Sequence, residues 1–164
     1  MKNLLLILLI FGGALAQTTQ GLTVEALPRA LQAELKVKDT YYPGESLEVA
    51  VKVSDEAYIY LFGVDPIGHT EQIFPNRYQK NNRLQANRTY RFPPASANYH
   101  FKVELPTGTH KVICLAARSQ LSPRVLQSVR GTSAELHLKR ALEAEPLPKS
   151  DWVIATQKYQ VRSR

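Results

Sequence analysis

The densest group of side chains with recognisable chemistry lies between residues 76 and 91. Five cations and two aromatic residues are interleaved there, namely Arg77, Tyr78, Lys80, Arg83, Arg88, Tyr90 and Arg91. Arginine can chelate a carboxylate or a phosphate with two hydrogen bonds, and tyrosine offers a flat amphipathic face to a sugar ring or a peptide. This combination predicts a loop that binds an anionic polymer or the edge of another protein. The alternative interpretation is a solvated loop whose cations only prevent edge-to-edge pairing of sheets.

The other residues that could carry chemistry form no local motif. The four histidines lie in different predicted elements, without metal-ligand spacing: His69, His100, His110 and His137. The chain has no Gly-x-Ser-x-Gly turn, no glycine-rich phosphate loop and no His-Glu-x-x-His pattern. We therefore expect no catalytic residue, no metal and no cofactor. Because a fold could still bring two histidines together beside Asp65, a metal-binding or small-ligand protein is the second hypothesis, and a hydrolase is the third.

The first sixteen residues predict where the protein works. Lys2 is followed by an apolar run over residues 4–11 and by a small-x-small cleavage site at Ala14-Leu15-Ala16. This is the pattern of a secretory signal peptide that is cleaved near Ala16-Gln17. No later stretch approaches the roughly 20 apolar residues of a membrane-spanning helix. We expect a periplasmic or secreted protein without a transmembrane segment.

Composition limits the size and the partners of the mature chain. Removing 16 of the 164 residues leaves 148, a common size for one domain with one hydrophobic core. Lys2 leaves with them, so 20 Lys and Arg remain against 14 Asp and Glu, a net charge near +6. In an exported protein this favours an envelope protein or an anionic envelope polymer over nucleic acid. The single cysteine, Cys114, cannot form an internal disulfide, and its apolar neighbours predict a buried core thiol.

Short strands must position these side chains. Alternation of apolar and polar residues, or apolar runs bounded by turn residues, predicts seven strands before residue 118. They cover residues 33–38, 47–53, 58–64, 70–74, 88–92, 99–103 and 110–117. The strand at 58–64 is apolar on both faces and is expected at the centre of the structure. A long polar loop over 75–87 lies between the fourth and fifth strands, and the regular spacing of strands favours a two-sheet sandwich.

The C-terminal part of the chain has a different character. Helix-forming residues predict a helix over 133–144, with Ser133 as its N-cap, and a shorter helix is expected over 123–129. A closing strand is expected over 152–161. Trp152 at its start could seal the core or mark a contact surface.

Several short signatures occur in an order that resembles a known bacterial family. They are Tyr42-Pro43-Gly44-Glu45, Tyr58-Ile59-Tyr60-Leu61, Val64-Asp65 with Gly68, Ile73-Phe74-Pro75-Asn76, Asn82-Arg83-Leu84, Phe92-Pro93 and Leu105-Pro106-Thr107-Gly108. Over about residues 35–117 the chain resembles a domain-of-unknown-function family, DUF4384. The resemblance implies an immunoglobulin-like sandwich in an exported or envelope-associated protein, and it brings no established activity, ligand or catalytic residue. Ala86 departs from the family pattern, in which a glycine is usual.

These observations combine into one expected organisation. A signal peptide at 1–16 and a linker at 17–31 precede a single domain at 32–164, whose helix and closing strand lie within 121–162. The domain is expected to be mainly β, an immunoglobulin-like antiparallel β-sandwich with one or two short C-terminal helices. We expect an exported, non-catalytic cell-envelope module that docks onto another envelope component through the basic loop or an exposed sheet edge.

Overall fold

The computed structural model describes residues 28–163, so the expected signal peptide and most of the expected linker lie outside the described residues. These residues contain strands, two α-helices and one short 3-10 helix. In chain order they are β1 (Ala33–Lys36), β2 (Thr40–Tyr41), β3 (Ser46–Leu47), β4 (Val49–Val53), β5 (Ala57–Val64), β6 (Thr70–Phe74), β7 (Arg83–Leu84), β8 (Thr89–Phe92), β9 (Phe101–Lys102), β10 (Gly108–Ala117), α1 (Pro123–Gln127), α2 (Ala134–Glu143), η1 (Lys149–Asp151) and β11 (Trp152–Val161).

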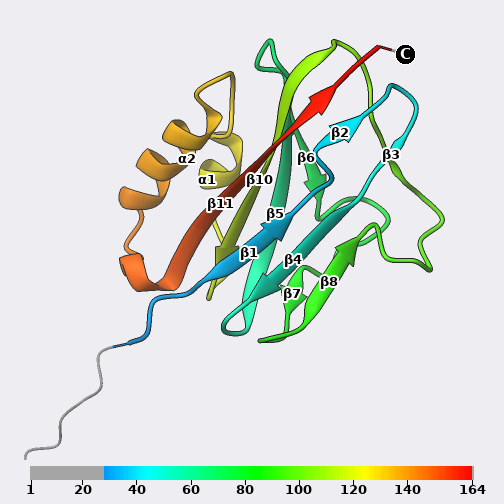
Figure 1. The fold of residues 1–164 in the computed structure, drawn as a ribbon. Coiled ribbons are helices and arrows are strands. Elements are labelled where there is room, and N and C mark those ends of the chain that lie inside the picture. Colours follow the sequence, from blue (N-terminus) through cyan, green and yellow to red (C-terminus); the bar gives the residue numbers. More distant parts are fainter. Residues whose placement is uncertain (1–27, 164) are drawn as a thin grey trace, which may run out of the picture.

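The strands form a large and a small sheet that pack face to face (Figure 1). The large sheet has the order β2-β11-β10-β5-β6, with β7 beside the start of β5, and the small sheet has the order β1-β4-β8. β3 and β9 form a separate pair. The fold is mainly β and sandwich-like, which confirms the predicted class. Within residues 28–163 one ladder departs from the antiparallel prediction: β2 continues the direction of β1 into the large sheet and runs parallel to β11.

The first hydrophobic cluster fills the space between the two sheets. Alternate residues of β4 contribute Val49, Val51 and Val53, each at most 1% exposed. The rings of Phe74 and Phe92 meet there with centroids 4.3 Å apart. Cys114 of β10 is fully buried in the same cluster, as predicted, and burial raises the pKa of its thiol to about 12.

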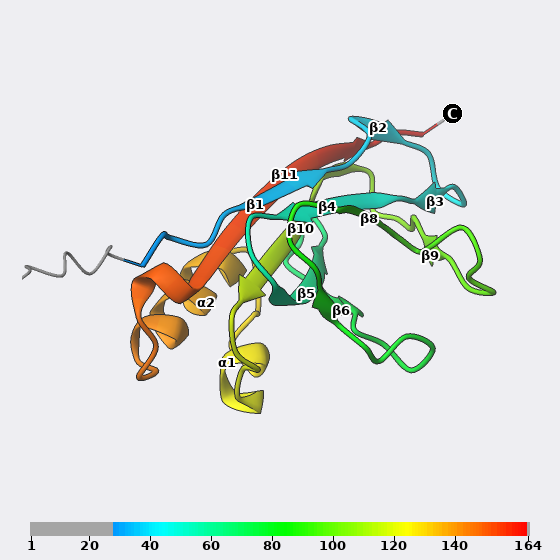
Figure 2. The same ribbon diagram turned by 90° about the horizontal axis from the view of Figure 1, so that it is seen from below.

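A second hydrophobic cluster covers the opposite face of the large sheet. Figure 2 shows α1 and α2 on the side of β10 and β11 that lies away from β1 and β4. Leu138 and Leu142 of α2 and Val125 of α1 are completely buried against this face. Trp152 packs against the same cluster. The expectation of one hydrophobic core is therefore wrong, because the large sheet separates two, and this is why β5 and β10 are apolar on both faces.

Local interactions define the ends of the helices and one unusual turn. The Ser122 side chain accepts a hydrogen bond from the Val125 amide at the start of α1. Ser133 precedes α2 as predicted, but its side chain makes no capping hydrogen bond. After Ala86, the left-handed conformation falls on Asn87, with φ at 60°. Asparagine tolerates this conformation, so the alanine does not prevent the turn.

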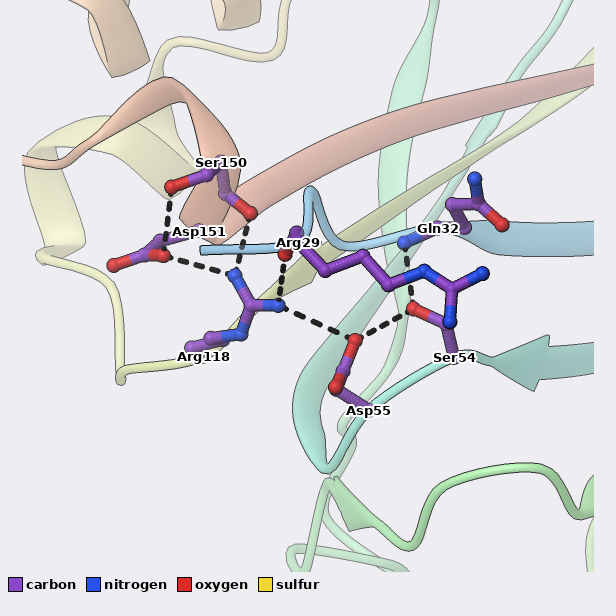
Figure 3. A network of polar contacts seen from close by, with 7 residues as sticks. All are labelled: Arg29, Gln32, Ser54, Asp55, Arg118, Ser150 and Asp151. Atoms are coloured by element: carbon purple, nitrogen blue, oxygen red, sulfur yellow. Dashed lines mark hydrogen bonds and ion pairs between the residues drawn. The ribbon is translucent and has the colours of Figure 1, made fainter. Parts of the chain in front are cut away.

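Arg118, just after β10, joins three distant segments of the chain. Figure 3 shows its guanidinium between the N-terminal segment, the β4–β5 turn and η1. It donates hydrogen bonds to the carbonyl oxygens of Arg29 and Ser150 (both 2.6 Å), and it pairs with the carboxylates of Asp151 (2.9 Å) and Asp55 (3.2 Å). Leu31, at the end of the expected linker, is buried beside this network and donates its amide to the Ser150 carbonyl. Residues 29–31 therefore pack as part of the domain.

Replacing Arg118 with alanine is expected to lower the free energy of unfolding by about 2–3 kcal/mol. The reason is that two carboxylates and two carbonyl groups lose a charged donor at a site where only 26% of the Arg118 side chain is exposed. Urea unfolding followed by circular dichroism measures the change. Arg124 is exposed on α1 and offers a matched control, for which Arg124→Ala should change stability by less than about 0.5 kcal/mol. An equal loss in both variants would contradict this role of Arg118.

Candidate functional site, a basic groove on the small sheet

The side chains of the predicted basic loop do not gather at one place. Arg77 lies over the ring of Tyr78, with its guanidinium carbon 4.6 Å from the ring centroid. The Tyr78 ring also stacks on Tyr99, with centroids 5.2 Å apart and planes 12° from parallel. The Tyr99 hydroxyl donates to the Gln79 side chain at 2.8 Å. Arg77 and Tyr99 both contact the Tyr78 ring, which is still 55% exposed.

The next cations of the loop also have partners within the protein. Arg83 forms an ion pair with Glu56. Arg88 donates to the Gln85 side chain at 2.9 Å and lies over the ring of Tyr90, 5.6 Å from its centroid. Tyr90 itself packs against the cluster between the sheets. These contacts stabilise the conformation of the loop itself.

Arg91 has a different environment, because it lies on the outer face of the small sheet. Its neighbours Tyr90 and Phe92 pack against the core, so the alternation of a strand places Arg91 on the opposite face. In the register of the sheet Arg91 stands opposite Ala50 of β4, and Ala50 stands opposite Lys36 of β1. Lys36, Ala50 and Arg91 therefore form one row across the three strands, with two cations on either side of a small residue.

The neighbouring row on the same face adds a third cation. Glu34, Lys52 and Thr89 stand opposite one another on β1, β4 and β8. Throughout residues 28–163, no hydrogen bond or ion pair of the structure occupies the side chain of Lys36, Lys52 or Arg91. Lys80 of the basic loop is also exposed and lacks such a partner in the described chain. It lies outside the strands, so no strand pairing places a second cation beside it.

A groove of about 610 Å³ opens beside the row of Lys36, Ala50 and Arg91. Its far wall is formed where the chain leaves β1 and turns into β3, and it includes the ion pair between Lys38 and Glu45 at 3.1 Å. Two free cations beside an alanine suit a carboxylate or a phosphate, since both oxygens of such a group can be reached at once. Glu48 lines the same groove and limits where an anion can sit.

The histidines do not build a metal centre in the described part of the chain. His110 is buried, its ring stacks on Tyr159, and its Nε2 lies 2.7 Å from the Pro106 carbonyl oxygen, to which it donates. Nowhere in residues 28–163 do three His, Cys, Asp or Glu side chains lie close enough to hold a metal ion. The helices of this region are also too short or too polar to cross a membrane.

Two of the three cations on this face were missed by sequence reasoning. Lys36 and Lys52 occupy the polar positions of two amphipathic strands, which usually signify a solvated surface. The alternation of apolar and polar residues, combined with the pairing of the strands, would have identified both lysines. The pairing depends on the fold, so only Arg91 was identified.

Comparisons with known proteins agree with the resemblance seen in the sequence. No curated protein matches the chain. The sequence model of a family described as a domain of unknown function, DUF4384, matches residues 40–120. The match begins at β2 and ends just after β10, so it includes Ala50 and Arg91 of the groove and the neighbouring Lys52, and it leaves out Lys36. Over residues 40–120 the chain is similar to the DUF4384 family of domains of unknown function.

Proposed function

We propose that this protein is an exported, non-catalytic cell-envelope module that docks onto an anionic envelope component. The docking surface is the outer face of the small sheet. The observation that carries the proposal is the row of Lys36, Ala50 and Arg91, in which two cations without protein partners flank a small residue at the edge of a groove. The pattern of residues 1–16 supports export, and the absence of a catalytic motif in the sequence supports a binding role.

The spacing of the strands makes this face suitable for one anionic group. Neighbouring strands lie about 4.8 Å apart, so the backbones of Lys36 and Arg91 are separated by about 10 Å. Long side chains at this separation can converge on a ligand that lies over Ala50. Lys52 stands two residues further along β4 on the same face and adds a third charge. The net charge of the mature chain, near +6, attracts anions to the whole molecule, and the row gives them a specific position.

Removing these three charges is expected to weaken the binding of anionic polymers. The variant K36S/K52S/R91S should bind immobilised polyglutamate or polyphosphate at least about tenfold more weakly, because each lost charged hydrogen bond is worth about 1.5–3 kcal/mol. Biolayer interferometry at two salt concentrations measures the affinity. The matched control is R124S/K139S/R140S, which removes the same charge from exposed positions on the helices and should keep most of the affinity.

The two variants distinguish a site from a general charge effect. If the helix variant loses as much affinity as the sheet variant, net charge alone explains binding and the proposed docking face is wrong. A third variant, R77S/K80S/R83S/R88S, tests the basic loop that the sequence suggests. If this loop variant loses binding while K36S/K52S/R91S retains it, the partner docks on the loop.

A further inference from the structure

β8 has an open edge, and hydrogen bonds at the end of β4 show which groups of β8 face it. The Ser54 amide donates to the Gln32 carbonyl on the β1 side, at 3.0 Å. The Asn87 amide donates to the Val53 carbonyl on the β8 side, at 2.8 Å. In a regular strand the polar backbone groups of successive residues point to opposite sides. Val49, Val51 and Val53 therefore direct their backbone groups toward β8, and Ala50 directs its groups toward β1.

The ladder between β4 and β8 then fixes the orientation of β8. Val51 stands opposite Tyr90 and Val49 stands opposite Phe92, so these two residues of β8 use their amide and carbonyl groups toward β4. Thr89 and Arg91 direct theirs toward the other side. Among the described residues β8 pairs with β4 alone, and it stands at the margin of the small sheet in Figure 1. In the described chain, the outward backbone groups of Thr89 and Arg91 have no backbone partner.

We propose that the anionic partner is a polypeptide whose extended acidic segment adds to the small sheet as a strand beside β8. This inference rests on the proposed function and specifies its partner. The outward amides and carbonyls of Thr89 and Arg91 supply backbone hydrogen bonds, which is the usual basis of strand addition. Every second side chain of the added strand then lies on the outer face beside Arg91, where a carboxylate pairs with the guanidinium. The alternate side chains lie on the inner face beside Tyr90 and Phe92, where apolar residues fit.

The charge of the small sheet explains why the segment is acidic. Lys36 and Arg91 flank Ala50 on the outer face of the sheet, Lys52 stands opposite Glu34 in the neighbouring row, and Arg91 is on the edge strand itself. Opposite charges directly across two strands stabilise the pairing by about 0.2–1 kcal/mol, and like charges oppose it. A polyanion without amide groups can use the cations but cannot bond to the open edge. The edge and the cations together therefore favour a peptide with alternating acidic and apolar residues.

A synthetic peptide and a single substitution test the strand. The probe is an eight-residue peptide of alternating Glu and Val, compared with a copy of the same charge in which every backbone amide is N-methylated. The variant is Thr89→Pro, which removes the outward amide of β8 and leaves the ladder to β4 intact, as prolines on edge strands do. Thr89→Ala is the matched control, because it keeps the amide. Thermal unfolding of both variants confirms that the fold is retained.

The expected result is that the unmodified peptide binds, and that N-methylation or Thr89→Pro weakens binding at least about tenfold while Thr89→Ala does not. Isothermal titration calorimetry measures each affinity. If both peptides bind equally and K36S/K52S/R91S binds neither, the strand addition is overturned and the anionic docking face stands. The same conclusion follows if polyphosphate binds and neither peptide does. If no anionic probe binds the unaltered protein, the proposed function fails as well. Should Thr89→Pro fail to fold, the comparison of the two peptides decides.

Discussion

A chain that lacks every residue after Gln120 is expected not to fold, although it contains the whole segment matched by the family. β11 lies between β2 and β10 and pairs with all ten residues of β10, from Gly108 to Ala117. Without β11, the long apolar strand β10 becomes an exposed edge, which is an aggregation hazard. Without α1 and α2, the outer face of the large sheet loses its cover.

The loss of apolar burial is larger than the stability of a typical domain. The deleted segment contributes these buried side chains: Leu121, Val125, Val129, Leu138, Leu142, Tyr159 and Val161. Each large buried side chain contributes about 1.5–3 kcal/mol, so their sum reaches the whole net stability of about 5–15 kcal/mol that is usual for a domain. Circular dichroism and urea unfolding measure the outcome. A control that lacks only residues 163–164 should unfold cooperatively, and a cooperative transition in the long deletion would contradict the prediction.

The central strands could be predicted well from the sequence, because their long apolar runs fit only a buried strand. The strand expected at 58–64 is β5 at Ala57–Val64, and the strand expected at 110–117 is β10 at Gly108–Ala117. The closing strand expected at 152–161 agrees with β11 at both ends. A strand that is apolar on both faces needs cover on both sides. The sequence does not say whether a sheet or a pair of helices provides this cover, and here each covers one face.

The short strands could not be predicted, because a strand of two residues is too short to show an alternation of apolar and polar residues. β2 lies between the strands expected at 33–38 and 47–53, and β7 lies within the expected polar loop. The strand expected at 47–53 divides at Glu48 into β3 and β4, where Tyr41 places its hydroxyl 3.4 Å from both the amide and the carbonyl oxygen of Glu48. These divisions depend on contacts between residues that are distant in the sequence. The same contacts place residues of β2, β3 and β4 around the groove.

The candidate site illustrates the same limit. Arginine and tyrosine types pointed to the loop, but the side chains of Arg83 and Arg88 find partners in their own protein. Lys36 and Arg91 are 55 positions apart in the chain, and they become part of one row only because Ala50 of β4 pairs with both. The residue types therefore suggested a surface that binds anions. The register of β1, β4 and β8 determines which cations share one face.

The second large effect is expected at alkaline pH, where stability should fall steeply above pH 9. Burial raises the pKa of the Cys114 thiol from its ordinary 9.0 to about 12. Burial, together with the charge of Tyr41, raises the pKa of the Tyr159 phenol from its ordinary 10.0 to about 12. Both groups lie in the cluster between the two sheets. Each of them therefore holds its proton more tightly in the folded protein than in the unfolded chain.

The direction of the effect follows from this difference in proton binding. Below pH 9 the folded and unfolded states both keep the Cys114 proton, so its stabilising contribution is fully present. Between pH 9 and about 12 the unfolded chain releases this proton and the folded protein retains it, so the free energy of unfolding falls by about 1.4 kcal/mol per pH unit. The sum for Cys114 is about 4 kcal/mol at pH 12. Tyr159 adds a similar slope above pH 10.

Substitution of each group isolates its part, because the variant lacks only the proton that the substituted side chain would release. Urea unfolding at pH 8 and pH 11 gives the loss of stability for the parent protein, for Cys114→Ala and for Tyr159→Phe. The loss should be about 3 kcal/mol smaller in Cys114→Ala and about 1 kcal/mol smaller in Tyr159→Phe. The cost of the cavity in Cys114→Ala cancels, since it is present at both pH values. A Cys114→Ala variant that loses as much stability as the parent would show that the thiol does not resist ionisation in the core.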